Sequence, residues 1–202
     1  MPAFALRLSP CDPSYRQRPS VRPDQQPVPA PLLRSRLPFS KERTMPFVYR
    51  GVADLEKSSK VGGGECARLV QHYLPRVGHT STWVPGERVI EVLQAGGKIE
   101  PGKAVAMFVN GRYPTSGHRH AALYEGAVTA CAYDPKLKRC PIVGVILMDQ
   151  WNPQPGNPEK NRVSRRTVFR RGQMRSNGSW PSPSDNAEAL YVIEHRATVK
   201  AK

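Results

Sequence analysis

Cys66 is the first residue of this sequence whose type and setting suit nucleophilic chemistry. It follows a run of three glycines at residues 62–64, and apolar residues recur behind it at the helical interval until Pro75 ends the pattern. We therefore expect Cys66 in the first turn of an amphipathic helix, where unpaired backbone N–H groups and the helix dipole favour a thiolate. Because the dipole alone has a modest effect, a nucleophile there needs a second partner. The alternative is a small buried residue on the core side of the helix, which is the commoner role of a lone cysteine.

Two histidines are candidates for that partner. His120 directly precedes the apolar run at residues 121–124, so a strand should fix its position, whereas His118 lies in the loop before it. A third polar group must hold the imidazole tautomer, and Asp149 ends another apolar run, where a buried acid requires a partner. Alternation along a strand puts Asp149 and Gln150 on opposite faces, so only one of them can face His120. We favour Asp149 and keep His118 and Gln150 as alternates.

The elements that would position these residues are one helix followed by a meander of strands. The Pro85-Gly86 pair predicts a turn and then a short helix at residues 86–93. A long basic loop at residues 133–139 predicts an antiparallel hairpin around it. The expected strands cover residues 104–109, 120–124, 142–151 and 163–171. This order predicts an α+β fold in which the helix that carries Cys66 packs on an antiparallel sheet.

This sequence resembles the papain-like cysteine amidases of the NlpC/p60 and CHAP superfamily in the order of its elements: a cysteine at a helix start, the turn Pro101-Gly102 before an apolar strand, a Gly/His segment that runs into His-Ala-Ala-x-Tyr, and a strand that ends in an acid. Three segments are similar, more closely, to a small bacterial branch of that superfamily. They are Gly-x-Cys-x-x-Leu-Val-Gln at residues 64–71, Phe-Val-Asn-Gly-Arg-Tyr-Pro at residues 108–114 and Asp-Gln-Trp at residues 149–151. The resemblance covers roughly residues 46–171, whereas the loop at residues 129–141 and the chain beyond Gly172 depart from the pattern.

The resemblance implies an NlpC/p60 fold, a reaction and a set of residue roles. Such enzymes hydrolyse peptide or amide bonds, usually in peptidoglycan, and some related amidases are effectors injected into competing bacteria. Carried over to this sequence, the nucleophile is Cys66, the general base and acid is His120, and the orienting group is Asp149. The implied substrate is a peptidoglycan peptide or another amide, with no cofactor. For an effector, an immunity protein or a secretion partner is also expected.

Two other functions stay open at this point. The formal net charge of +15 fits a non-catalytic module that binds an anionic polymer, although we read the basic stretches at residues 136–139 and 162–171 as solvated faces and expect no specific nucleic-acid partner. A thioester intermediate also serves acyl transfer to an amine. A zinc site that includes Cys66 is disfavoured, because no second Cys/His cluster supports it.

Aromatic residues and two further cysteines add weaker expectations. Trp83, Tyr113 and Trp151 are candidates for lining a substrate groove, although aromatic side chains more often belong to the core. Cys131 and Cys140 flank the expected hairpin loop and would form a disulfide only in an oxidising compartment. We favour free thiols.

The composition predicts three parts of the chain. Residues 1–44 hold nine of the 21 prolines, eight Lys or Arg and only three acids, so we expect this segment to be disordered. Met45 is an alternative start, in which case the preceding segment is either a translated upstream region or a dispensable tail. Residues 45–172 are the expected NlpC/p60-like domain. Residues 173–202 are expected to be a mostly irregular tail, in which residues 187–195 could form a short helix or strand. No run approaches the ~18 apolar residues of a membrane span and no signal peptide is recognisable, so a cytoplasmic pool would need export without an N-terminal signal.

Overall fold

The computed structural model describes residues 47–130, 135–136, 140–153 and 161–195. Within these ranges, six strands form one antiparallel sheet in the order β1-β6-β2-β3-β4-β5. The strands are β1 (Trp83–Arg88), β2 (Ala104–Met107), β3 (Ala121–Thr129), β4 (Ile142–Asp149), β5 (Ser164–Phe169) and β6 (Leu190–His195). The helices are α1 (Cys66–Tyr73) and α2 (Val89–Gln94), with 3-10 turns η1 (Val52–Leu55), η2 (Gly62–Gly64), η3 (Pro75–Val77), η4 (Thr80–Thr82), η5 (Pro183–Asp185) and η6 (Ala187–Ala189). The predicted α+β class with an antiparallel sheet is confirmed.

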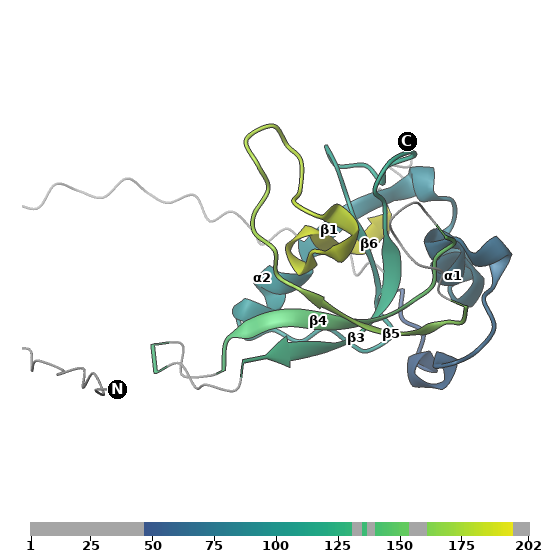
Figure 1. Ribbon diagram of the computed structural model, residues 1–202, viewed down its shortest axis with the longest axis horizontal. Helices are drawn as coiled ribbons and strands as arrows, with labels where there is room; N and C mark the ends of the chain where they lie inside the picture. The colour runs from purple at the N-terminus through teal and green to yellow at the C-terminus, as the bar shows by residue number, and fades with distance from the viewer. Residues whose placement is uncertain (1–46, 131–134, 137–139, 154–160, 196–202) are drawn as a thin grey trace, which may run out of the picture. The chain divides into compact units, whose positions relative to one another are not determined.

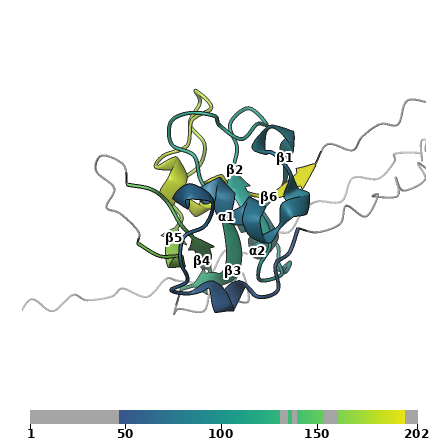
Figure 2. The same cartoon turned by 90° about the vertical axis from the view of Figure 1, so that its right-hand side faces the viewer.

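Alternate residues of β3 and β4 face two hydrophobic clusters, one for each helix. Leu123 of β3 and Met148 of β4 pack in the cluster that contains Leu69 of α1. Leu147, the neighbour of Met148, packs instead with Val89 of α2. Because side chains alternate along a strand, α1 and α2 cover opposite faces of the sheet. Figure 1 shows β3, β4 and β5 as neighbours, and Figure 2 shows the same strands and α1 from the side.

The helix α1 has the bounds that the apolar spacing predicts. It spans Cys66–Tyr73, and the side chains of Leu69 and Val70 are fully buried in the core. Leu74 leaves the helical conformation, with φ −130° and ψ 68°, because it precedes Pro75. The buried stripe thus fixes which side of α1 faces the sheet, and the proline fixes where the helix ends.

The predicted turn at Pro85-Gly86 is wrong. Both residues lie within β1, and α2 begins at Val89 rather than at residue 86. Proline cannot donate a ladder hydrogen bond, but β1 is an edge strand and its register shifts between Pro85 and Arg88. An edge strand with a bulge tolerates proline, so the turn signal carried no turn here.

The chain after residue 172 contributes an interior strand to the sheet. The strand β6 lies between β1 and β2, and pairs Ile193 with Pro85 and Val192 with Val105. Residues 173–186 are rich in Ser, Pro, Asn and Gly, and of the two possibilities at residues 187–195, a short helix or a strand, the structure has the strand over its last six residues. The domain therefore extends to His195.

Some expectations fall on residues outside the described ranges. These are the disorder of residues 1–44, the alternative start at Met45 and the state of Cys131. Cys140 is a free thiol. No helix among the described residues is long and apolar enough to cross a membrane.

Candidate active site

The end of β4 holds the loop that precedes α1. The Gln150 side chain is fully buried, and its Nε2 atom donates to the backbone carbonyls of Val61, at 2.7 Å, and Glu65, at 2.9 Å. Its Oε1 atom accepts from the Val61 backbone N–H at 3.0 Å. Glu65 directly precedes Cys66, so these three bonds fix the start of α1, and with it the thiol, against the sheet.

His120 and Asp149 form a buried pair beside that thiol. His120 Nε2 lies 2.8 Å from Asp149 Oδ2, and the two residues are 4% and 0% exposed. His120 directly precedes β3 and Asp149 is the last residue of β4, so the pairing of these two strands brings them together. When Nε2–H is donated to the carboxylate, Nδ1 is the ring nitrogen left for Cys66.

The thiol and the imidazole shift each other's acidity. Burial alone raises the pKa of the Cys66 thiol, but the hydrogen bond and charge of His120, the Tyr113 hydroxyl and the Ala121 backbone together lower that pKa below its ordinary value. Burial lowers the pKa of His120, but its hydrogen bonds with Asp149 and Cys66 and their charges outweigh this and raise the pKa to about 9. Both shifts favour the charged thiolate–imidazolium pair over the neutral thiol and imidazole.

Arg166 of β5 completes this cluster, and the sequence reading missed it. Its Nε atom donates to Asp149 Oδ2 at 3.0 Å, and its Nη2 atom lies 3.1 Å from His120 Nε2. Its Nη1 atom donates to Asp185 at 2.8 Å. The residue belongs to the basic stretch 162–171, which was expected to be a solvated face. The available signal was alternation, since Val168, two positions on, is buried.

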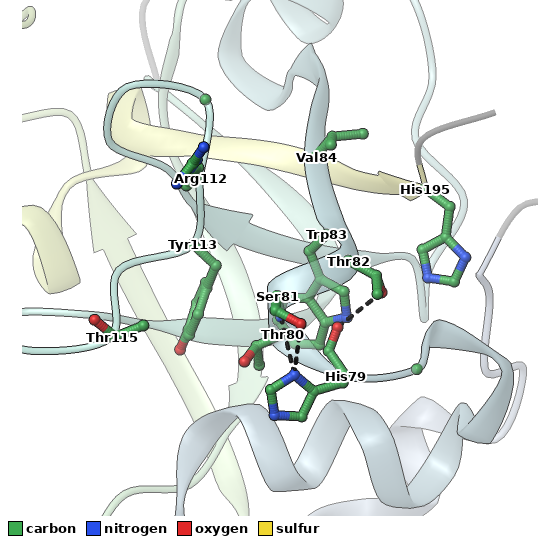
Figure 3. A pocket seen from close by; sticks show the side chains of 12 residues that line it. His79, Thr80, Ser81, Thr82, Trp83, Val84, Arg112, Tyr113, Thr115 and His195 are labelled. Atoms are coloured by element: carbon green, nitrogen blue, oxygen red, sulfur yellow. Dashed lines mark hydrogen bonds between the residues drawn. The ribbon is translucent and has the colours of Figure 1, made fainter. Parts of the chain in front are cut away.

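Tyr113 contacts the thiol and also lines a cavity, which is drawn in Figure 3 without Cys66. Its hydroxyl lies 3.6 Å from Cys66 Sγ, and its ring lines a cavity of about 770 Å³. Trp83 lines the same cavity, but it is a core residue with 1% of its surface exposed, and its Nε1 atom donates to the Val77 carbonyl. Two of the three aromatic residues that were candidates for a groove therefore border one cavity beside Cys66.

The remaining candidates lie elsewhere. His118 is exposed in the loop between β2 and β3. Gln150 bonds the loop before α1, as described above, so it is corrected from an alternate third residue to an anchor of the helix start. Trp151 is half-buried and lies under the Arg166 guanidinium, 5.4 Å from the ring centroid, and it is not among the residues that line the cavity. Among the described residues, no group of three or more His, Cys, Asp or Glu is arranged to hold a metal ion.

A cysteine at the start of a helix, packed on an antiparallel sheet that carries a buried His–Asp pair, is consistent with the papain-like class of amidases. A relative from Salmonella typhi, described as type VI secretion amidase effector 2 protein, is 38% identical over 155 residues, which cover 74% of this chain and 100% of the relative. A solved structure, described as type 6 secretion amidase effector 2 (Tae2), matches with a TM-score of 0.59 and 36% identity, covering 76% of this chain and 98% of that chain. No protein-family model matches the chain. The chain belongs to the type VI secretion amidase effector 2 family.

Proposed function

We propose that this protein is a cysteine amidase of the NlpC/p60–CHAP type that hydrolyses an amide bond in bacterial peptidoglycan. The observation that carries the proposal is the buried His120–Asp149 pair, 2.8 Å apart, beside a thiol whose pKa is lowered. A cysteine that served only as an apolar core residue would not require a buried His–Asp pair next to its thiol. The names of the two relatives support the amidase activity and delivery by a type VI secretion system.

The first half of the reaction forms a thioester. The Cys66 thiolate attacks the carbonyl carbon of the scissile amide and generates a tetrahedral oxyanion. The Cys66 backbone N–H, at a helix start where it has no intrahelical acceptor, is one donor to that oxygen. The Tyr113 hydroxyl is the second donor, because burial raises its pKa and keeps the proton on the oxygen. His120 then gives its proton to the leaving amine as the C–N bond breaks.

The second half releases the acid. Water enters after the amine has left, His120 takes a proton from it, and the resulting hydroxide attacks the thioester carbonyl. Collapse of this second tetrahedral species breaks the C–S bond and regenerates the thiolate. Asp149 accepts a hydrogen bond from the His120 imidazole throughout, which keeps the Nδ1 atom of His120 directed to the reacting groups.

The test is incubation with purified peptidoglycan followed by mass spectrometry of the released fragments. The wild-type protein and Cys140→Ala, which removes the other described free thiol, should release the same fragments, whereas Cys66→Ala should release none. Thermal unfolding of Cys66→Ala checks that its fold is kept. Full activity in Cys66→Ala would overturn the proposal. Binding without fragments in the wild type would favour a binding module, and conjugate to an added amine in place of acid would favour acyl transfer.

A further inference from the structure

The cavity beside Cys66 extends the site well beyond the reacting groups. Its volume of about 770 Å³ is enough for several peptide residues. Tyr113 is shared between the cavity and the thiol, since its ring lines the one and its hydroxyl lies 3.6 Å from the other. Cys66 and His120 do not line the cavity themselves, so a ligand there would be linked to the reacting groups through Tyr113.

The lining of the cavity has a clear chemical character. Hydroxyl groups are contributed by Thr80, Ser81 and Thr82 of η4 and by Thr115, and none of the lining residues is Asp or Glu. Figure 3 shows Arg112 and Tyr113 on one loop and the hydroxyl-bearing residues of η4 on a second segment. Thr82 Oγ1 donates to the His79 carbonyl at 2.8 Å, and Ser81 Oγ lies 2.8 Å from His79 Nδ1, so these two hydroxyls are already engaged. The hydroxyls of Thr80 and Thr115 are the ones that this lining offers to an anion, with no lining carboxylate to repel it.

Arg112 is the group that gives this cavity a permanent charge. Two histidines also line it, but both make other contacts: His195 Nε2 lies 2.6 Å from the Val77 carbonyl, and His79 Nδ1 lies 2.8 Å from Ser81 Oγ. Within the part of the chain that the structure describes, no ion pair joins the Arg112 guanidinium to a carboxylate, and the residue is exposed. Its charge is therefore available to a ligand.

A rigid turn holds Arg112 at the cavity. Val109 and Arg112 exchange two backbone hydrogen bonds, of 2.9 and 3.0 Å, across a two-residue turn. The turn residues Asn110 and Gly111 have φ values of 49° and 71°, the conformation that a tight hairpin requires. Arg112 is thus presented by a short hairpin rather than by a long loop, which limits the entropy lost when it binds a ligand.

We propose that this cavity is a subsite for a carboxylate-bearing portion of the substrate and that Arg112 is the residue that recognises the carboxylate. The inference rests on the proposed amidase function, because it names the chemistry of the substrate next to the scissile bond. Arg112 acts through the charge-assisted hydrogen bonds that a guanidinium makes with a carboxylate. It determines specificity and takes no part in the chemical step.

The experiment compares two forms of one probe. Soluble peptide fragments of peptidoglycan are used either as free acids or after their carboxylates have been converted to methylamides with carbodiimide and methylamine. We expect the wild type to cleave the free acid with at least a tenfold higher kcat/KM, expressed mainly in KM, which is the factor that corresponds to about 1.4 kcal/mol. Arg112→Gln should lose this preference and keep the kcat of the methylamide. Arg50→Gln, which removes an exposed arginine outside the cavity lining, should keep the preference.

Binding to the Cys66→Ala protein separates the two proposals. Calorimetry with the same two probes measures the subsite without turnover. Preference for the acid in binding but no cleavage by the wild type would refute the amidase function and uphold the subsite. Cleavage of both probes with equal kcat/KM, or an unchanged preference in Arg112→Gln, would overturn the subsite and leave the amidase function standing.

Discussion

The Asp149 carboxylate is balanced between two positively charged partners. It is fully buried, and its Oδ2 atom accepts from His120 at 2.8 Å and from Arg166 at 3.0 Å. A buried carboxylate is tolerated only where its charge is compensated. Because the Arg166 charge is permanent, Asp149 can stay ionised whether or not His120 carries its second proton. The carboxylate is then a fixed partner for the imidazole through both halves of the proposed reaction.

The pH dependence of kcat/KM tests this pair. The pKa of His120 is raised to about 9, so the imidazolium persists up to that pH, and kcat/KM should fall as the pH rises through about 9 because the leaving amine is no longer protonated. Asp149→Asn removes the strongest influence that raises the pKa of His120. We expect it to lower kcat/KM by about 10²–10⁴-fold and to move the alkaline limb to lower pH. If kcat/KM of Asp149→Asn fell at the same alkaline pH as that of the wild type, the assignment of Asp149 as the partner of His120 would be contradicted.

Replacement of Arg166 should move the same limb in the opposite direction. In Arg166→Gln, the carboxylate loses one cation and the imidazolium loses a neighbouring positive charge, so the alkaline limb should shift to higher pH. The loss of the buried hydrogen bonds should also lower the free energy of unfolding by about 2 kcal/mol. The measurements are pH–rate profiles and denaturant unfolding.

Arg165→Gln is the matched control for this change. Arg165 is the preceding residue of β5, but it pairs with Glu125 and Glu56 at the surface. Its replacement should leave both the alkaline limb and the melting temperature nearly unchanged. A stability loss in Arg166→Gln with no shift of the limb would indicate a purely structural role for Arg166.

Sequence reasoning reached part of this cluster. Helical spacing and the apolar runs predicted that Cys66, His120 and Asp149 would lie together, and the structure brings them together; their catalytic roles stay a proposal. Arg166 was out of reach because most residues of the basic stretch are exposed, and only the register between β4 and β5 turns this one inward. An exposed and a partly buried arginine look alike in the sequence when their strand partners are unknown.

At the scale of elements, the end of β4 positions both halves of the proposed site. Asp149 holds His120, and the next residue, Gln150, holds the loop before α1. Since adjacent strand residues point to opposite faces, one strand end fixes the imidazole on one side and the start of the cysteine helix on the other. The distance between nucleophile and base is therefore set by a rigid part of the sheet.

The glycine turn before α1 can be tested with a matched pair of substitutions. Both Gly63 and Gly64 have positive φ, 74° and 81°, but a Cβ at Gly63 meets no atom within 4 Å, whereas one at Gly64 would lie 2.2 Å from Asn152 Oδ1. Gly63→Ala should cost about 1 kcal/mol in unfolding free energy. Gly64→Ala should cost about 2–3 kcal/mol and reduce kcat, because Asn152 must also give up its bond to the Gly63 carbonyl. Equal losses in unfolding free energy and in kcat would show that the contact with Asn152 does not matter.

The elements themselves were predictable to different degrees. The helix α1 carries an apolar stripe and a terminal proline, and both bounds follow from these local signals. The strand β1 could not be predicted from local signals. Its Pro85-Gly86 pair indicates a turn, except where the strand lies at a sheet edge and contains a bulge, as β1 does. Whether a strand is an edge depends on the order of the whole sheet, which local patterns do not contain.

At the scale of the whole molecule, the order of the strands brings the C-terminal part of the described chain into the interior of the sheet. The sheet places β6, the last described element, between β1 and β2, which are joined in sequence through α2. Every residue of the proposed site lies on elements whose positions depend on this sheet. The pairing of β6 with β1 and β2 joins parts of the chain that are far apart in the sequence, so β6 has a structural role that local composition does not indicate.

Two truncations test this division of the chain. A protein that lacks residues 1–44 keeps all six described strands and the proposed site, so its melting temperature and its release of peptidoglycan fragments should equal those of the full chain. A protein that ends at Asn186 lacks β6, so that among the described strands β1 has no partner left and β2 keeps only β3. Because these edges would expose unpaired backbone groups and the apolar surface that Ile193 covers, we expect no cooperative thermal transition and no cleavage. A cooperative transition after the second truncation would mean that the sheet is stable without its interior strand.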